Sequence, residues 1–226
     1  MKLFIDTHVH AYPSYDFAAM SDAFLRRARH HGAGFGVMML AQRERMDFPA
    51  QFLPDEKAAA IAGRQIACKE RVEILALGTE VEFKDGIPAK DAIMQALDVG
   101  ALPVLAWGIG KWLLSRAKVV DSLLDAFTPA QLAIGDSALR PFFWGEPIPM
   151  RRARKAGYTI LHGSDPLPRP AEELRAGKYG DILDAPDFDP SKPIAPQVMK
   201  LLREGAPRQV GRRAGLFEFI KSVGKA

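Results

Sequence analysis

The sequence predicts an α/β fold in which a parallel sheet closes into a barrel. Apolar strand-like segments alternate with helical patterns six times in 226 residues, and such alternation builds parallel sheets with right-handed crossovers. Polar residues suited to chemistry follow several different strands, as in barrels, whose sites are assembled from the loops at the carboxyl ends of the strands. The first strand lacks the glycine-rich phosphate loop that is typical of an open nucleotide-binding sheet.

Length and composition indicate a single globular domain, residues 1–226. Hydrophobic residues make up 48% of the chain and charged residues 26%, which is ordinary for a globular protein. No uncharged apolar run reaches the roughly 18 residues of a membrane span, and the N-terminus lacks a signal-peptide pattern. The one cysteine, Cys68, cannot form an internal disulfide. We therefore expect a cytoplasmic protein with no membrane partner.

The mildly basic charge balance bears on the choice of partner. The net charge is +4, and short clusters of arginine and lysine fall on predicted helices, where such clusters usually form solvated faces. No zinc-finger, basic-zipper or aromatic-rich RNA-binding pattern accompanies them. The sequence therefore predicts no nucleic-acid partner, whereas a basic mouth would suit a small phosphorylated substrate.

The first predicted strand, residues 3–10, ends in two histidines, His8 and His10. Side chains on an extended backbone repeat every two residues, so both imidazoles point the same way. Two such nitrogen donors can bind one transition-metal ion. Asp6 could support them by bonding a ligand ring or the strand terminus. The same pair would also fit a solvent-facing strand, or a rim of hydrogen bonds with no metal.

Five further strands follow from short, nearly all-apolar runs, which are typical of strands buried on both faces of a parallel sheet. They are predicted at residues 34–40, 71–77, 101–107, 130–135 and 158–161.

Helices are predicted where apolar residues recur at helical spacing; Ser21 and Asp22 cap the first helix and Gly32 ends it. The helices span residues 21–32, 55–69, 91–99, 111–127, 150–156, 197–204 and 213–223. Loops rich in proline or charge occupy residues 42–54, 141–149 and 166–196, the last with a helical turn at 171–175 and an extended piece at 181–183.

Side chains that could bind a metal recur at the predicted strand ends. They are His8 and His10 after the first strand, Glu80 and Glu82 after the third, Asp136 after the fifth, and His162 and Asp165 after the sixth. Imidazoles and carboxylates brought to one mouth suit zinc, manganese or iron. Glu82 and Asp136 equally fit exposed loop carboxylates, and His162 fits a core histidine within its strand.

Three motifs give the chain a family resemblance. Asp6-Thr7-His8-Val9-His10 is similar to the opening Asp-x-His-x-His motif of the PHP (polymerase and histidinol phosphatase) family of metal-dependent phosphoesterases. Gly78-Thr79-Glu80 resembles its Gly-x-Glu motif, whose glutamate bridges metals, and Gly163-Ser164-Asp165 resembles the start of its Gly-Ser-Asp-x-His motif. Residues 212–219 resemble its closing helix. The resemblance implies a distorted, TIM-like (β/α)7 barrel over nearly the whole chain.

The chain also departs from the family pattern at three expected histidine positions. Leu40-Ala41 replaces an Asp-His pair, Trp107-Gly108-Ile109 replaces His-Pro-Gly, and Leu167 replaces the last histidine of the late motif. The resemblance then leaves His8, His10, Glu80 and Asp165 as metal ligands. This set implies a reduced site with one divalent transition metal, Zn, Mn or Fe.

The activity that the resemblance implies is hydrolysis of a phosphate ester by a metal-activated water. Asp165 or His162 would act as general base, and Arg140 and Arg169, with Lys111, could supply positive charge. Two alternatives stay open. One is an amidohydrolase-like enzyme that cleaves a C–N bond, and the other is a barrel that has lost catalysis and binds a ligand or partner.

Overall fold

The computed structural model describes residues 1–43 and 57–223, whose strands form two mixed five-stranded sheets. The first sheet has the order β10-β9-β1-β2-β3, built from β1 (Lys2–Val9), β2 (Phe35–Leu40), β3 (Ala58–Ile61), β9 (Tyr179–Asp184) and β10 (Arg208–Gly211). The second has the order β4-β5-β6-β7-β8, built from β4 (Gly63–Ala67), β5 (Glu73–Leu77), β6 (Leu102–Ala106), β7 (Ala133–Ser137) and β8 (Ile160–Gly163).

The predicted TIM-like (β/α)7 barrel is therefore wrong: the strands do not form one closed parallel sheet. β9 pairs antiparallel with β1 and with β10, and β5 pairs antiparallel with both β4 and β6. The connection between β4 and β5 is a short turn over residues 68–72. A parallel neighbour needs a crossover of a dozen residues or more, so this turn allows only a hairpin.

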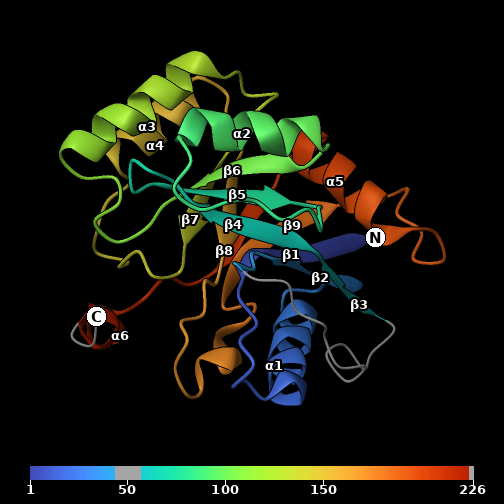
Figure 1. Cartoon of the computed structure of the whole chain (residues 1–226). Coiled ribbons are helices and arrows are strands. Elements are labelled where there is room, and N and C mark those ends of the chain that lie inside the picture. Colours follow the sequence, from blue (N-terminus) through green and yellow to red (C-terminus); the bar gives the residue numbers. More distant parts are fainter. Residues whose placement is uncertain (44–56, 224–226) are drawn as a thin grey trace.

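Helices cover the outer faces of the two sheets (Figure 1). α1 (Phe17–His30) covers the first sheet, and α2 (Ala89–Asp98), α3 (Ser115–Ala126) and α4 (Ile148–Lys155) cover the second. The later elements are the short 3₁₀ helix η2 (Glu172–Arg175), α5 (Ile194–Glu204) and α6 (Leu216–Val223). None of the helices in the described ranges has the length and apolar character to cross a membrane.

Three apolar clusters fill these layers. Leu3 and Ile5 of β1 face the core between the sheets, to which α5 also contributes, whereas Phe4 faces α1. In β6, Val104 faces the other sheet and Leu105 packs toward the helices of the second sheet. Both faces of these strands are buried, which explains why the five predicted apolar strands are confirmed as β2, β5, β6, β7 and β8 with only their ends shifted.

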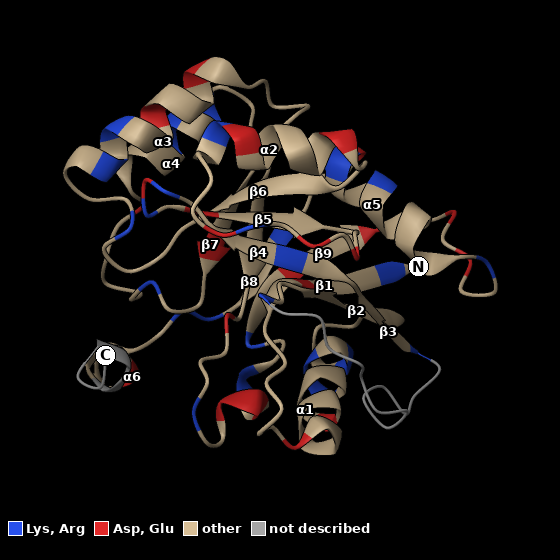
Figure 2. Ribbon diagram, viewed as in Figure 1, with Lys and Arg blue, Asp and Glu red and all other residues tan. Residues whose placement is uncertain are grey.

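Charged side chains lie mainly on the outer helices. Figure 2 shows both signs of charge along α3, and Arg152 of the basic helix α4 pairs with Asp121 of α3 at 2.8 Å and also with Asp125. The basic residues of α4 therefore form a solvated face that is neutralised by its neighbour, as expected for an exposed helical cluster.

The predicted helix at residues 55–69 is wrong in its described part, residues 57–69, which form β3 and β4. Alanines at positions 58–60 and 62 favour a helix by propensity alone, but tertiary contacts decide. A Cβ on Gly63 would lie 2.3 Å from the Leu40 carbonyl oxygen, so β4 approaches the end of β2 more closely than another residue would allow. Most of the predicted loop at 42–54 lies outside the described residues.

The late part of the chain has more strand than predicted. The region 166–196, expected to be mostly loop, contains the six-residue strand β9 in place of the short extended piece at 181–183. β10, which follows α5, was not predicted. β9 lies beside β1 and places residues near position 181 next to the first strand.

The two sheets meet where β1 and β8 end. The Thr7 hydroxyl donates to the His162 carbonyl oxygen at 2.9 Å, and the Asp165 amide donates to the His8 carbonyl oxygen at 2.8 Å. A Cβ on Gly163 would lie 2.5 Å from the His8 nitrogen, so only glycine permits this approach. We call this contact the β1–β8 seam. It brings His8 and His10 next to Asp165, which follows β8.

Candidate metal centre

Three potential ligands converge at the β1–β8 seam. The Nε2 atoms of His8 and His10 lie 3.1 Å apart, and Oδ1 of Asp165 lies 3.6 Å from each. Both histidines are buried, and the Asp165 side chain is mostly buried. This His–His–Asp group is the one cluster in the described residues whose three ligand atoms could hold a single metal ion.

The backbone at Asp165 aims its carboxylate at the imidazoles. Asp165 has a φ of 49°, the left-handed region that aspartate tolerates better than most residues. Its amide is fixed by the His8 carbonyl, and the Ser137 hydroxyl donates to its Oδ2 at 3.0 Å. Oδ1 is thereby directed toward the two histidines. Ser137, at the end of β7, has a positioning role that the sequence did not reveal.

Asp6 supports the seam from behind and is fully buried. Its Oδ1 accepts from the Ser164 amide at 2.9 Å, and its Oδ2 accepts from the Gly177 amide at 2.7 Å. The His8 amide also donates to it, at 3.3 Å. Burial raises its pKa to about 6, although these hydrogen bonds act in the opposite direction. Asp6 thus holds backbone at the strand terminus.

The surroundings of His10 favour its neutral imidazole. Burial, and then the neighbouring imidazole of His8, lower the pKa of His10 to about 4, against the opposing effect of Asp165. At neutral pH, His10 therefore has a nitrogen lone pair available, which metal binding requires.

The donor set and spacing fit a metal ion. Two nitrogens bound to one zinc at about 2.0–2.1 Å in a tetrahedral arrangement are roughly 3.3 Å apart, close to the observed 3.1 Å. Two imidazoles and one carboxylate suit zinc, manganese or iron. Three protein ligands are also the number found in catalytic zinc sites, which keep another position for water or substrate. The group could therefore bind a metal ion.

A polar chain extends from the group into the second sheet. The Gln65 side chain places its Oε1 3.2 Å from His8 Nε2, and its Nε2 donates to Glu73 Oε1 at 3.2 Å. The Lys111 ammonium pairs with the same Glu73 oxygen. Gln65 and Glu73 were missed by the sequence analysis, because Gln65 falls in the wrongly predicted helix and Glu73 lies at the start of its strand rather than at its end.

Glu80 and Glu82, expected near the histidines, lie elsewhere. Both side chains are exposed, and the backbone oxygen of Glu80 accepts from Arg64 at 3.1 Å. The reason is strand direction: β5 runs antiparallel to β6, with Glu73 opposite Ala106 and Leu77 opposite Leu102. The carboxyl end of β5 therefore points away from the edge where β6, β7 and β8 end.

His162 and Asp181 form a buried pair beside the group. His162 Nδ1 lies 2.6 Å from Asp181 Oδ1, and the His162 amide donates to Oδ2 at 2.8 Å. The His162 ring also contacts Tyr179 edge-on. Burial raises the pKa of Asp181, although its bonds to His162 oppose this effect. These contacts hold His162 in the wall of the seam.

Arg140 and Asp136 form a second buried pair. The guanidinium binds both Asp136 oxygens, at 2.7 and 2.5 Å, and donates to the carbonyls of Trp144 and Gly145. Tyr179 adds a hydroxyl bond to Asp136 at 2.9 Å. Arg140 is thus committed to holding the loop after β7. Arg169 is half-buried in the loop after β8 and is not part of the His–His–Asp group.

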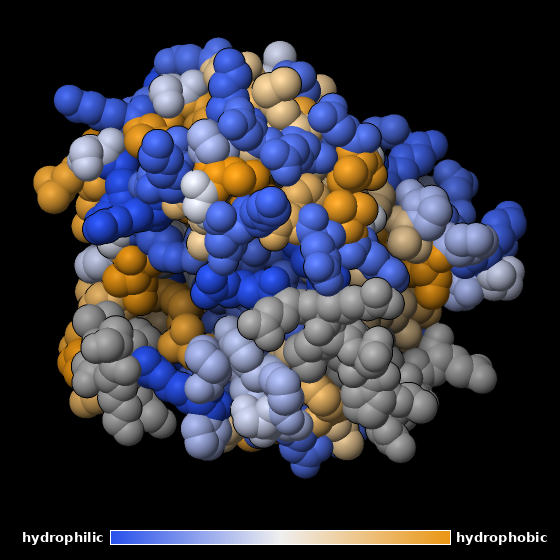
Figure 3. Space-filling view, in the orientation of Figure 1, coloured by the Kyte–Doolittle hydropathy of each residue, from blue (hydrophilic) through white to orange (hydrophobic). Residues whose placement is uncertain are grey.

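A cavity of about 750 Å³ with an aromatic lining opens at the edge of the second sheet where β6 and β7 end. Trp107, which follows β6, lines it together with Trp112, Phe143, Trp144 and Arg140. Figure 3 shows hydrophobic surface at the left edge of the molecule, on the side where α6 lies. A cavity of this size with an aromatic lining is suited to the organic part of a ligand.

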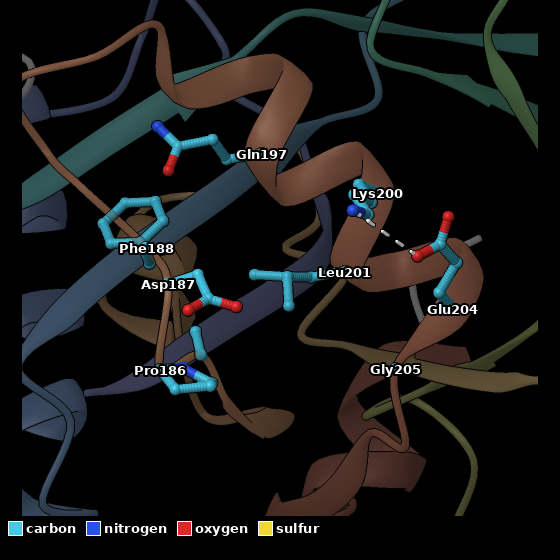
Figure 4. A pocket seen from close by; sticks show the side chains of 9 residues that line it. Pro186, Asp187, Phe188, Gln197, Lys200, Leu201, Glu204 and Gly205 are labelled. Carbon is cyan, nitrogen blue, oxygen red and sulfur yellow. Dashed lines mark ion pairs between the residues drawn. The ribbon is translucent and has the colours of Figure 1, made fainter.

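A different hollow of about 450 Å³ lies beside α5 (Figure 4). Phe188 and Leu201 supply apolar lining, and Lys200 and Glu204 form an ion pair at 4.0 Å along the helix. Its wall includes Ala185, whose amide binds the Met1 carbonyl at the start of β1. The His–His–Asp group lies at the other end of this strand, roughly 20 Å away at about 3.3 Å per residue. This hollow is separate from the candidate site.

Comparisons with known proteins show relatives in fold alone. No protein-family model and no curated protein matches the chain. Among solved structures it resembles PsfC from Pseudomonas syringae PB-5123, with a TM-score of 0.62, 14% identity, and 93% of this chain and 91% of that chain covered.

Two structures of endonuclease Q are also similar to this chain. The lesion-specific endonuclease PfuEndoQ from Pyrococcus furiosus has a TM-score of 0.56, 15% identity, and 93% of this chain and 59% of that chain covered. Endonuclease Q in complex with a 27-mer duplex substrate, with an abasic lesion at the active site, has a TM-score of 0.58, 14% identity, and 94% and 60% coverage.

The predicted membership in the PHP family is wrong. No family model matches the chain, and its described strands form two mixed sheets in place of the seven-stranded barrel that the resemblance implied. The short motifs around His8 and Asp165 correctly indicated two strand ends that meet, but Gly78-Thr79-Glu80 lies at the opposite edge of its sheet. At 14–15% identity, the three structures place this α/β architecture beside PsfC and endonuclease Q in fold.

Proposed function

We propose that this protein is a metal-dependent hydrolase that cleaves phosphate esters with one divalent transition metal, Zn, Mn or Fe, held by His8, His10 and Asp165. The observation that carries the proposal is the convergence of two buried imidazoles and one carboxylate whose spacing fits a single ion. The low pKa of His10 supports it, because that ring stays neutral at the pH of a cell.

A bound ion would supply Lewis acidity at a phosphoryl oxygen and a nucleophilic water at neutral pH. The chain's own groups would perform the remaining tasks. Asp165, held through Oδ2 by Ser137, would keep its Oδ1 directed at the ion beside the two imidazoles. Lys111, joined to His8 through Glu73 and Gln65, would offset negative charge on the phosphoryl group.

The substrate class rests on the chemistry of such sites and on the structural neighbours. Endonuclease Q is a nuclease, so its reaction cleaves a phosphodiester, and one of its structures contains duplex DNA as substrate. We therefore place phosphodiesters first among the phosphate esters for this chain. The aromatic cavity beside β6 would receive the organic part of the substrate, such as a base or an aryl group.

The first test is metal content. Purified native protein, His8→Ala and His30→Ala are compared by inductively coupled plasma mass spectrometry after incubation with excess Zn²⁺, Mn²⁺ or Fe²⁺ and removal of free metal. His30 is an exposed histidine outside the group, so it is the matched control. We expect about one ion per chain in the native protein and in His30→Ala, and none in His8→Ala.

The second test is turnover by the loaded protein. Bis(p-nitrophenyl) phosphate, p-nitrophenyl phosphate and p-nitroacetanilide separate diester, monoester and C–N hydrolysis. Release of nitrophenol that is lost in His8→Ala and retained in His30→Ala supports the proposal. Metal-free native protein would refute it, and the 3.1 Å contact between the two imidazoles would then be a hydrogen bond in a ligand-binding protein. Turnover of the anilide alone would replace phosphate esters by amides.

A further inference from the structure

A third hollow, of about 400 Å³, lies between the last turn of α1, the segment from η2 to β9, the end of β10, and α6. We call it the basic pocket. Its lining includes four side chains with fixed positive charge: Arg27, Arg175, Lys178 and Arg212. The described lining also includes one carboxylate, Glu218, and two imidazoles, His30 and His31. No member of the His–His–Asp group lines this pocket.

The cations are held in place by the fold. Arg27 uses Nη1 to donate to the carbonyls of Ala23 and Ala176, at 3.2 and 2.8 Å. The Arg212 amide donates to the Lys178 carbonyl at 3.0 Å, which keeps β10 beside the start of β9. Lys178 is only 9% exposed. Arg27 and Lys178 therefore form a built wall of the pocket, whereas the side chain of Arg212 is 76% exposed.

Arg175, one of the lining cations, has donors that lack an acceptor. Arg175 has two buried guanidinium nitrogens, Nε and Nη2, that make no hydrogen bond within the described part of the chain, although a Glu172 oxygen lies 3.3 Å from Nε. The Lys178 ammonium pairs with Glu218, and Arg212 reaches the same oxygen only at 3.9 Å. One carboxylate thus serves two cations. Buried donors of this kind ordinarily have a partner.

Neighbouring positive charges also lower the pKa values of two cations in the pocket. Burial, followed by the charge of Arg26, lowers the pKa of Arg27. Burial likewise lowers the pKa of Lys178, with Arg175 and Arg212 adding to the effect and Glu218 opposing it. An added anion would reverse both effects, because an opposite charge within a few ångströms favours the charged form.

We propose that the basic pocket binds the phosphate group of a ligand. Guanidinium groups match phosphate oxygens with two parallel N–H donors, and a lysine adds a point charge, so this lining suits phosphate better than a carboxylate of lower charge. The volume admits a phosphate together with a sugar-sized group. The site does not depend on the metal-dependent activity proposed above, because it uses none of the same residues.

Replacing Glu218 allows a test in which the direction of the change in phosphate affinity is predicted. Its carboxylate already occupies donors of Lys178 and accepts from the Gly215 amide at 2.8 Å, and its pKa is lowered to about 2 because these bonds outweigh the effect of burial. It is thus an internal anion that competes with phosphate. Glu218→Gln retains an acceptor for the Gly215 amide but removes the charge, so it should strengthen phosphate binding.

The experiment is isothermal titration calorimetry of chelator-treated full-length protein with inorganic phosphate at constant ionic strength. Native protein is compared with Arg212→Gln, Glu218→Gln and Arg208→Gln; Arg208 is an exposed arginine of β10 outside the pocket lining and is the matched control. Because the Arg212 side chain is mostly exposed, we expect Arg212→Gln to bind roughly 3- to 10-fold more weakly. Glu218→Gln should bind more tightly, and Arg208→Gln should equal the native protein.

Circular dichroism establishes that each variant is folded, and His8→Ala should keep native phosphate affinity even where it loses metal. Displacement of inorganic phosphate by ribose 5-phosphate would identify a small phosphorylated ligand as the source, and displacement by single-stranded oligothymidylate would identify a nucleic-acid backbone. The proposal is overturned if native protein takes up no phosphate, if Arg208→Gln weakens binding as much as Arg212→Gln, or if Glu218→Gln fails to tighten it.

Discussion

Replacing Gly163 by alanine should damage the candidate metal centre although no ligand residue is replaced. An ideal Cβ at this position would lie 2.3 Å from the His8 Cβ and 2.5 Å from the His8 nitrogen. Carbon contacts are comfortable at about 3.5–4.0 Å, so β1 and β8 must separate locally by roughly 1 Å. Gly163 does not have a positive φ, so the backbone itself accepts alanine. The perturbation is therefore purely a matter of space at the seam.

The size of the effect follows from this displacement. Metal ligands must be held within about 0.5 Å of their productive positions, and His8 would move relative to Asp165, which stands on the other strand. We expect the affinity for Zn²⁺ to fall roughly 10- to 100-fold, the range seen when support for a ligand is lost. Crowding a packed seam should also lower the free energy of unfolding by about 1–3 kcal/mol.

The assay is a titration of metal-free protein with Zn²⁺ in competition with a chromophoric chelator, together with urea unfolding. Gly145→Ala is the control, because the added methyl group there meets nothing within 4 Å and the residue has no positive φ. The reasoning is refuted if Gly163→Ala binds Zn²⁺ with native affinity, or if Gly145→Ala loses as much affinity.

Three further predictions concern charge. Asp136→Asn leaves the buried Arg140 without its counterion and should lower the free energy of unfolding, measured in urea, by roughly 3–5 kcal/mol. Asp121→Asn, at an exposed ion pair, should lower it by at most about 1 kcal/mol. Equal losses in the two variants would contradict the argument from burial. The pKa of Glu218 is depressed from 4.5 to about 2, so its ion pair with Lys178 should stabilise the fold fully above pH 4.5 and lose this effect as the pH falls toward 2; native protein and Glu218→Gln should therefore converge in stability at pH 2. Chelation of a bound metal should lower the unfolding free energy by about 2.7 kcal/mol when the free metal had been at 100 times its Kd, and the same treatment should leave the stability of the His8→Ala variant unchanged.

The strands that the sequence predicted correctly are those whose residues are buried on both faces. The run from Phe35 to Leu40 has no exposed residue, and its length of six residues favours a strand over a helix. The stretch 58–67 failed because alanine is compatible with helix and strand alike, and the choice was made by the approach of Gly63 to Leu40. A single sequence contains no signal for such a contact between strands.

The direction of the strands was the larger obstacle to predicting the site from the sequence. His8, His10 and Asp165 could be found because they lie at the ends of strands that meet at one seam. Glu80 was misplaced because a hairpin reverses β5, and the same reversal brings Glu73 to the correct edge. Direction depends on pairing partners, which apolar periodicity does not encode.

The β1–β8 seam joins Thr7 to His162, 155 residues apart in sequence. During synthesis the two histidines emerge well before Asp165, which follows His10 by 155 residues. While the intervening residues are made, a nascent chain therefore offers a metal two donors, and the third arrives with the strand that closes the seam. Tight metal binding would thus be a late step in the synthesis and folding of the chain. Metal bound earlier would be held more weakly than in the finished protein.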